Sequence, residues 1–139
     1  MSQLNRAKLK QLAETRLADA AILLRNRRFS AAYYLAGYSI ECGLKACIAR
    51  QTRRYDFPDK DRTLKSYQHK FSELVKLAGL NPQVESERDP LGFGAYWNVV
   101  EQWSEQRRYD VIAANDAKDM LRAISDPNHG VLRWLRRNW

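Results

Sequence analysis

The chain has 139 residues, of which 45% are hydrophobic and 11% aromatic. This composition excludes a disordered chain and is sufficient to build one hydrophobic core. We therefore expect a single domain over residues 1–139. No stretch has the layout of a signal peptide or a membrane span, so we expect a cytoplasmic protein with no membrane partner.

The positive charge is unevenly distributed along the chain. The formal net charge is +8, from 24 Lys and Arg against 16 Asp and Glu. Residues 1–55 hold 11 basic and 3 acidic residues, whereas residues 56–139 hold 13 of each. Such asymmetry indicates a nucleic-acid surface or an acidic partner, although a basic face that only keeps the protein soluble explains it equally well.

The first two predicted helices form an antiparallel hairpin. Apolar residues recur every three to four positions from Asn5 to about Arg27, and a short link leads to a long apolar helix from Phe29 to Arg54. Ser30 is the expected N-cap of the second helix. The glycines at 37 and 43 predict that another element packs closely against it.

One narrow face of the second helix is polar and aromatic. Tyr34, Tyr38, Glu41 and Lys45 are spaced by four, three and four residues, so they share a face. The stripe is either an i,i+4 ion pair beside two half-buried tyrosines or a binding surface that faces a cleft or a dimer partner.

Shorter elements are expected after a charged loop over 53–65. Ser66 is the expected cap of a helix that ends at Gly79, with His69 in its first turn as a structural residue. Residues 80–93 are predicted to be a loop, followed by a helix over 95–107. Asn115 is the expected cap of the next helix, and the pair Asp126-Pro127 is the expected start of the last one. The fold class is therefore an all-α, up-and-down bundle of five to six helices.

No metal site or cofactor is expected from the sequence. Cys42 and Cys47 lie five residues apart on one helix, too far apart to bridge, and the two His residues show no ligand spacing. We expect both cysteines to be free.

Four pieces of the chain together resemble the HEPN family of small helical domains. They are YYLAGYSIECGLKA (33–46), HKFSELVKLAGL (69–80), RRYD (107–110) and GVLRWLRRNW (130–139). The resemblance implies a HEPN-like bundle, a homodimer, and nucleotide or RNA binding. It also implies a place beside a nucleotidyltransferase partner or in a toxin–antitoxin or defence module.

Many members of that family are metal-independent ribonucleases with an Arg, four to six residues, and then a His. The arginine that matches is Arg108, but no His follows it as far as Asn115. Arg122 and His129 satisfy the spacing, although they lie on either side of the break at Asp126. The resemblance therefore favours a non-catalytic protein; the alternatives are a ribonuclease that uses Arg108, or Arg122 with His129, and a protein-interaction module.

A binding surface is predicted from the basic and aromatic residues. Arginines can bind phosphate and tyrosines can stack on bases, whereas the simpler interpretation of Tyr109 is a core aromatic that anchors a loop. The candidate binding residues are Tyr34, Tyr38, Glu41, Lys45, Arg53, Arg54, Arg107, Arg108 and Tyr109.

Overall fold

The computed structural model describes residues 4–55 and 69–139, and every regular element in these two ranges is helical. The all-α bundle predicted from the sequence is thereby confirmed. The described ranges hold seven α-helices, one more than the upper expectation, together with one 3-10 helix. They are α1 (Arg6–Arg25), α2 (Phe29–Tyr55), α4 (Phe71–Leu77), α5 (Pro82–Arg88), α6 (Phe93–Val100), η1 (Glu105–Tyr109), α7 (Ala114–Ser125) and α8 (Val131–Arg136).

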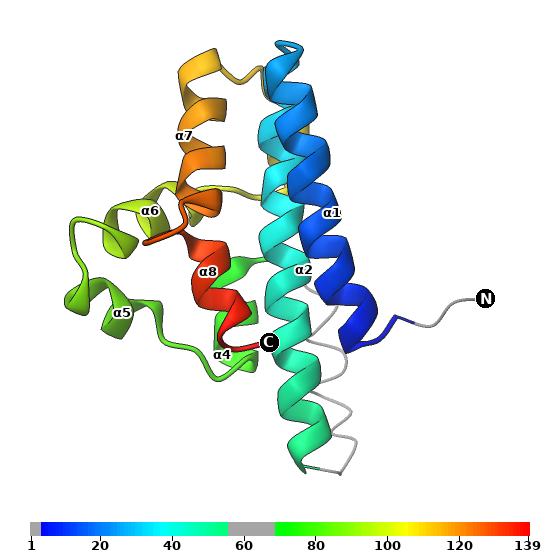
Figure 1. The fold of residues 1–139 in the computed structure, drawn as a ribbon, viewed down its shortest axis with the longest axis vertical. Helices are drawn as coiled ribbons and strands as arrows, with labels where there is room; N and C mark the ends of the chain where they lie inside the picture. Colours follow the sequence, from blue (N-terminus) through cyan, green and yellow to red (C-terminus); the bar gives the residue numbers. More distant parts are fainter. Residues whose placement is uncertain (1–3, 56–68) are drawn as a thin grey trace.

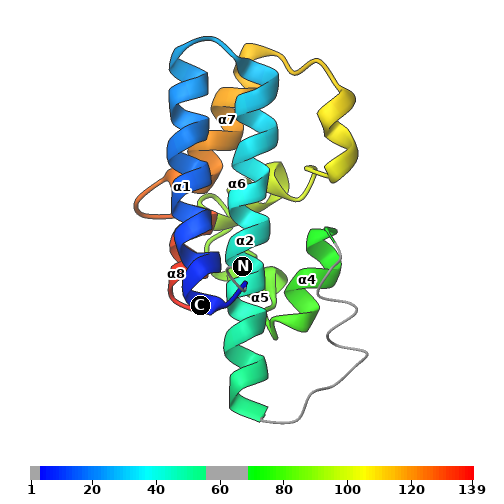
Figure 2. The ribbon, with the colours of Figure 1, turned by 90° about the vertical axis from the view of Figure 1, so that its right-hand side faces the viewer.

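The two long helices α1 and α2 lie antiparallel, as the hairpin prediction required (Figures 1 and 2). The turn between them places Arg27 in the left-handed region with φ of 60°. The backbone N–H of Arg28 then donates to the carbonyl of Leu23 at 2.9 Å, which closes the end of α1. In the described ranges, no helix is both long and apolar enough to cross a membrane.

Helices α7 and α8 lie along α2 and run in the same direction as it does (Figure 1). The start of α7 is fixed to the start of α2, because Ser30 Oγ accepts a hydrogen bond from the backbone N–H of Ile112 at 2.9 Å. The prediction that Ser30 caps α2 is wrong, since the helix already begins at Phe29 and the hydroxyl bonds to another segment.

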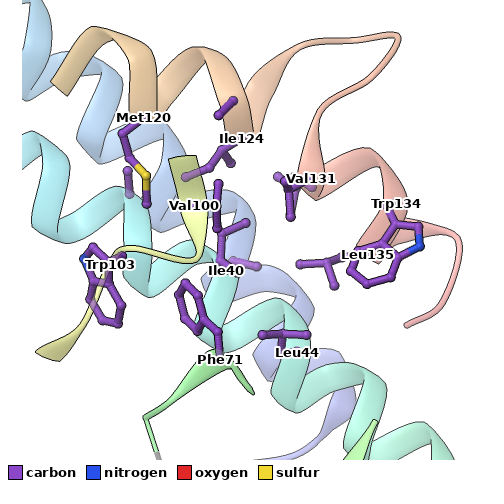
Figure 3. Close-up of a cluster of buried hydrophobic side chains, with 14 of the residues drawn as sticks. Ile40, Leu44, Phe71, Val100, Trp103, Met120, Ile124, Val131, Trp134 and Leu135 are labelled. Carbon is purple, nitrogen blue, oxygen red and sulfur yellow. The ribbon is translucent and has the colours of Figure 1, made fainter. Parts of the chain in front are cut away.

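The core fills the space between α2 and the shorter helices (Figure 3). It is built from aliphatic and aromatic side chains of α2, α4, α6, α7, α8 and the turn after α6, all nearly or fully buried. They include Ile40, Leu44, Phe71, Val100, Trp103, Met120, Ile124, Val131, Trp134 and Leu135. Gly43 permits this packing, because a Cβ there would be 2.9 Å from Leu135 Cδ1.

Helix α4 begins later than predicted. Residues 69 and 70 are not helical, so His69 precedes the helix and does not lie in its first turn. The predicted cap Ser66 lies outside the described residues. The predicted stop is confirmed: Gly79 has φ of +69°, and the N–H of Leu80 donates to the carbonyl of Val75 at 2.9 Å.

The prediction of a loop over 80–93 is wrong, because residues 82–88 form α5. Asn81 caps this helix by accepting from the backbone N–H groups of Gln83 and Val84, and Pro82 is its first residue. Proline needs no amide partner at that position, so the pair Asn81-Pro82 is a helix start. The acidic composition of the segment hid this signal.

The predicted helix over 95–107 is divided in two. Helix α6 ends at Val100, and the N–H of Trp103 donates to the carbonyl of Val100 as the chain turns toward η1. Trp103 lies in this turn and is only 3% exposed.

Two other predicted helix starts are shifted. Helix α7 begins at Ala114, so Asn115 is inside the helix and is not its cap. Asp126 does bind backbone amides, those of Asn128 and His129, but they belong to a turn. The last helix starts only after this turn, at Val131.

Candidate functional site

The polar face of α2 exists as predicted. The hydroxyls of Tyr34 and Tyr38 are 3.0 Å apart, and Lys45 Nζ lies 3.5 Å from Glu41 Oε2. Glu41 is only 4% exposed, although it carries a carboxylate. A buried carboxylate needs hydrogen-bonding partners, so the contacts of Glu41 decide what this face can do.

Trp103 covers the aromatic half of the face. Its ring centroid is 5.5 Å from that of Tyr34 and 5.4 Å from that of Tyr38, and its indole N–H donates to the carbonyl of Tyr34 at 3.2 Å. On the other side Trp103 stacks on Phe71 at 5.1 Å. Burial, followed by the hydrogen bond with Tyr34, raises the pKa of Tyr38, so its hydroxyl stays protonated at neutral pH.

His69 is the second partner of Glu41. Its Nδ1 lies 2.6 Å from Glu41 Oε1, while its other ring nitrogen, Nε2, lies 3.5 Å from Glu105 Oε2. A histidine held by a buried carboxylate has a fixed ring orientation, as in many acid–base sites. His69 and Glu105 are functional candidates that sequence reasoning missed. Because Glu41, His69 and Glu105 come from separate segments, no local spacing could have revealed their contact.

Arg108 joins the cluster through Glu105. Its Nη1 lies 3.5 Å from Glu105 Oε1, and Tyr34 is a further neighbour of its side chain. Its guanidinium carbon lies 4.8 Å from the ring centroid of Tyr109. Contacts with these two tyrosines raise the pKa of Arg108, which is charged at any physiological pH.

Tyr109 is 76% exposed, so it is not a core aromatic, and that alternative from the sequence is wrong. The preceding residue, Arg107, has different partners: it lies over the ring of Tyr33 at 5.2 Å and 3.5 Å from Asp110. Of the predicted RRYD residues, Arg108 and Tyr109 therefore belong to the cluster, whereas Arg107 contacts Tyr33 and Asp110.

We call His69, Glu105, Arg108 and Tyr109 the η1 surface. A groove of about 640 Å³ lies between α4 and α6. Lys70 and Ser104, which are next to His69 and Glu105 in the sequence, line this groove, so the η1 surface adjoins it. The groove has an apolar lining made of Phe71, Val75, Leu80, Pro82, Trp97 and Trp103. Its exposed polar lining residues include Lys70, Lys76, Glu101 and Ser104. Concave sites of this size and character are typical of small-molecule pockets.

The other candidate pair lies elsewhere. His129 Nδ1 is 2.6 Å from Asp89 Oδ2, and Arg122 Nη1 is 3.9 Å from Asp119. Arg122 and His129 thus each have a carboxylate partner of their own. The Asp89–His129 pair covers Gly92, where a Cβ would be 2.5 Å from His129 Nδ1. This arrangement connects the α5–α6 loop to the α7–α8 turn.

Two further expectations concern charge and metal. Arg53 and Arg54 lie in the last turn of α2, and their side chains are outside the described part of the structure. Among the residues that the structure describes, no cluster of three or more His, Cys, Asp and Glu side chains is arranged to hold a metal ion. Both cysteines are free, as predicted.

No protein-family model matches this chain, and neither the curated proteins nor the solved structures contain a significant match. The HEPN resemblance therefore remains a prediction from the residues quoted above.

Proposed function

We propose that this protein binds RNA or a nucleotide through the η1 surface and does not itself cleave it. One observation carries the proposal: the guanidinium of Arg108 lies over the ring of Tyr109, which is 76% exposed. A large aromatic ring with a cation on its face, exposed to solvent, provides nothing to the core. It offers a stacking platform for a base beside a donor for phosphate.

The surroundings of Arg108 support the same ligand. His69 lies next to it through Glu105, and the groove between α4 and α6 opens beside both. In keeping with the HEPN resemblance, the proposed setting is a homodimer that works beside a nucleotidyltransferase or within a toxin–antitoxin or defence module. The positive excess of residues 1–55 would bring RNA toward the protein at long range.

Salt-dependent binding tests this proposal. Fluorescence anisotropy with a labelled single-stranded RNA should show affinity that falls as salt rises, with a log–log slope of about 0.7 per phosphate contacted. The Arg108→Gln variant should bind more weakly and with a slope lower by roughly one phosphate. Arg88→Gln is the matched control, since Arg88 is also exposed and also forms a weak ion pair, 3.9 Å from Glu85.

Two results would contradict RNA binding at this surface. If both arginine variants lose affinity equally, the contacts are general and not local to η1. If the wild-type protein binds no RNA at any modest salt concentration, the result favours the alternative function, a protein-interaction module with an acidic partner. Light scattering on the same samples measures whether the chain is a dimer.

A metal-independent ribonuclease is the second candidate, because His69 supplies the acid–base group that is absent downstream of Arg108. Its contact with Glu41 at 2.6 Å orients the ring, so Nε2 can exchange a proton with an RNA oxygen, and Arg108 can stabilise the charge that develops on phosphorus. Incubation of a mixed RNA pool in EDTA tests this. Cleavage that His69→Gln abolishes and His129→Gln preserves would establish the ribonuclease, and no cleavage would leave the binding function.

A further inference from the structure

The carboxylate of Glu105 lies between the imidazole ring of His69 and the guanidinium of Arg108. Its Oε2 is 3.5 Å from His69 Nε2, and its Oε1 is 3.5 Å from Arg108 Nη1. Each oxygen therefore faces a different donor, one that precedes α4 and one on η1. No other carboxylate in the described ranges bridges a histidine and an arginine in this way.

Both contacts are long and partly exposed. Charge-assisted hydrogen bonds between nitrogen and oxygen are usually about 2.7–2.9 Å. The bond of His69 to Glu41 has that character at 2.6 Å, but its contact with Glu105 does not. The Glu105 side chain is 37% exposed, so water reaches the carboxylate. Exposed ion pairs of this kind add little to stability, so Glu105 is not needed to hold the fold.

We propose that His69 and Arg108 form a phosphate-binding site, and that Glu105 occupies this site in the free protein. A phosphate group of RNA or of a nucleotide takes the place of the carboxylate when it binds. This inference rests on the proposed function, since it names the group of the ligand that the η1 surface recognises and the residue that competes with it.

The donors around Glu105 suit a phosphate better than a carboxylate. A phosphate presents several oxygens, so it can accept from Arg108 and from His69 at normal hydrogen-bond distances at the same time. The ring of His69 cannot turn away, because Glu41 holds its other nitrogen.

The charges behind the site leave it positive once Glu105 moves. Behind the site, the negative charge of Glu41 is shared between His69, at 2.6 Å, and Lys45, at 3.5 Å. The His69 ring places Nε2 toward Glu105 while Nδ1 faces Glu41, so this nitrogen and the Arg108 guanidinium are the groups that face the ligand. The carboxylate that opposes them is that of Glu105.

Replacing Glu105 with glutamine tests the inference. Inorganic phosphate and a short single-stranded RNA are titrated into the wild-type protein, Glu105→Gln and Glu73→Gln. Glu73→Gln is the matched control, because it removes the same charge from exposed α4, where Glu73 pairs with Lys76 at 3.9 Å. The chain has 2 His, so the ring signals of His69 and His129 are assigned in NMR spectra with one His129→Gln sample.

Glu105→Gln should bind phosphate roughly 3- to 10-fold more tightly than the wild type, as expected from the loss of two exposed ion pairs. The ring signals of His69 should move and those of His129 should not. Glu73→Gln should change the affinity less than about 2-fold. Equal effects of the two glutamate variants, or movement of His129 alone, would overturn the inference.

The outcomes separate this inference from the proposed function. RNA that binds the wild type and Glu105→Gln with the same affinity supports the function and contradicts the role of Glu105. Phosphate that binds tightly to Glu105→Gln, while no variant binds RNA, supports the phosphate site and contradicts the RNA function. A Glu105→Asp variant shortens the side chain and keeps its charge, so its affinity for phosphate should lie between those of the wild type and Glu105→Gln.

Discussion

The indole ring of Trp103 lies directly against the backbone of Gly37 in α2. A Cβ placed on Gly37 would be only 2.1 Å from Trp103 Cε2, so the glycine is required by this contact. The close approach lets the indole N–H reach the carbonyl of Tyr34 and lets the ring cover Tyr34 and Tyr38. One contact thus joins the turn between α6 and η1 to the face of α2 that carries Glu41.

Gly37→Ala should destabilise the protein. Alanine is a better helix former than glycine by about 1 kcal/mol, but the rigid indole cannot give way without leaving its stack on Phe71. Overpacking of this kind costs about 1–3 kcal/mol, and we expect a net loss in the free energy of unfolding measured with urea. Trp103 fluorescence should shift in the same variant.

Gly43→Ala is the control for that experiment. Its Cβ would be 2.9 Å from Leu135 Cδ1, the end of a flexible side chain that can move. The gain in helix propensity then offsets the strain, and we expect a change within about 1 kcal/mol. Equal losses in the two glycine variants would show that the indole contact is not special.

Glu41→Ala should also lower stability, because it leaves Lys45 and His69 without their shared carboxylate. Glu41 is buried, but its partners are partly exposed to water, so we expect a loss of about 1–3 kcal/mol rather than the larger cost of a fully buried pair. Glu41→Gln keeps the shape and should lose less. Glu73→Ala, at an exposed site, should change the urea midpoint little.

The sequence was sufficient to predict the long elements of the fold. The ranges of α1 and α2, the shared face of Tyr34 and Glu41, and the stop at Gly79 all follow from local periodicity and local backbone preference. These signals lie within one helix, so they do not depend on the rest of the chain.

The remaining parts depend on contacts that are distant in sequence. Helix α5 has only seven residues and a polar composition, so its periodicity was too short to detect. The bond between Glu41 and His69 spans 28 residues, and it forms because α4 packs on α2. The candidate site could therefore be predicted as a stripe on α2 and as the pair Arg108 and Tyr109, without the histidine and the carboxylate that join them.

Cys47 should be almost unreactive in the folded protein. Burial raises its pKa to about 12, so almost none of the reactive thiolate is present at pH 8.5. Labelling with iodoacetamide should be slow in buffer and fast in denaturant. Burial also raises the pKa of Cys42. The labelling rates are therefore measured in the Cys42→Ala variant, in which Cys47 is the remaining cysteine.

Because the pKa of Cys47 is raised, the free energy of unfolding should depend on pH in the alkaline range. In the unfolded chain the thiol ionises near pH ~8.5, whereas in the folded protein it keeps its proton. The contribution of Cys47 to the free energy of unfolding is therefore complete below pH ~8.5 and is lost as the pH rises toward the pKa of the thiol in the folded protein. Cys47→Ala should unfold with a flatter dependence on pH between about 8.5 and 10. Identical slopes for the variant and the parent would contradict a protonated buried thiol.

Asp89 should contribute to stability against acid. The backbone N–H of Phe93, and then the His129 side chain, lower the pKa of Asp89 below its ordinary value. A lowered folded-state pKa means that the stabilisation is present above the ordinary aspartate pKa of about 3.9 and is lost as the pH falls through the folded-state pKa. Asp89→Asn should therefore show a smaller loss of stability on acidification than the wild type, measured as the urea midpoint at a series of acidic pH values.

Tyr109→Ala separates ligand binding from folding. Tyr109 is 76% exposed, and its ring lies against the guanidinium of Arg108. Removing the ring should therefore change the free energy of unfolding by less than about 0.5 kcal/mol. If a base stacks on it, the same variant should weaken RNA binding by about 1–3 kcal/mol. Because stacking carries no charge, the salt slope should stay the same, unlike that of Arg108→Gln. An unchanged RNA affinity in Tyr109→Ala, with the Arg108 effect intact, would assign binding to the arginine alone.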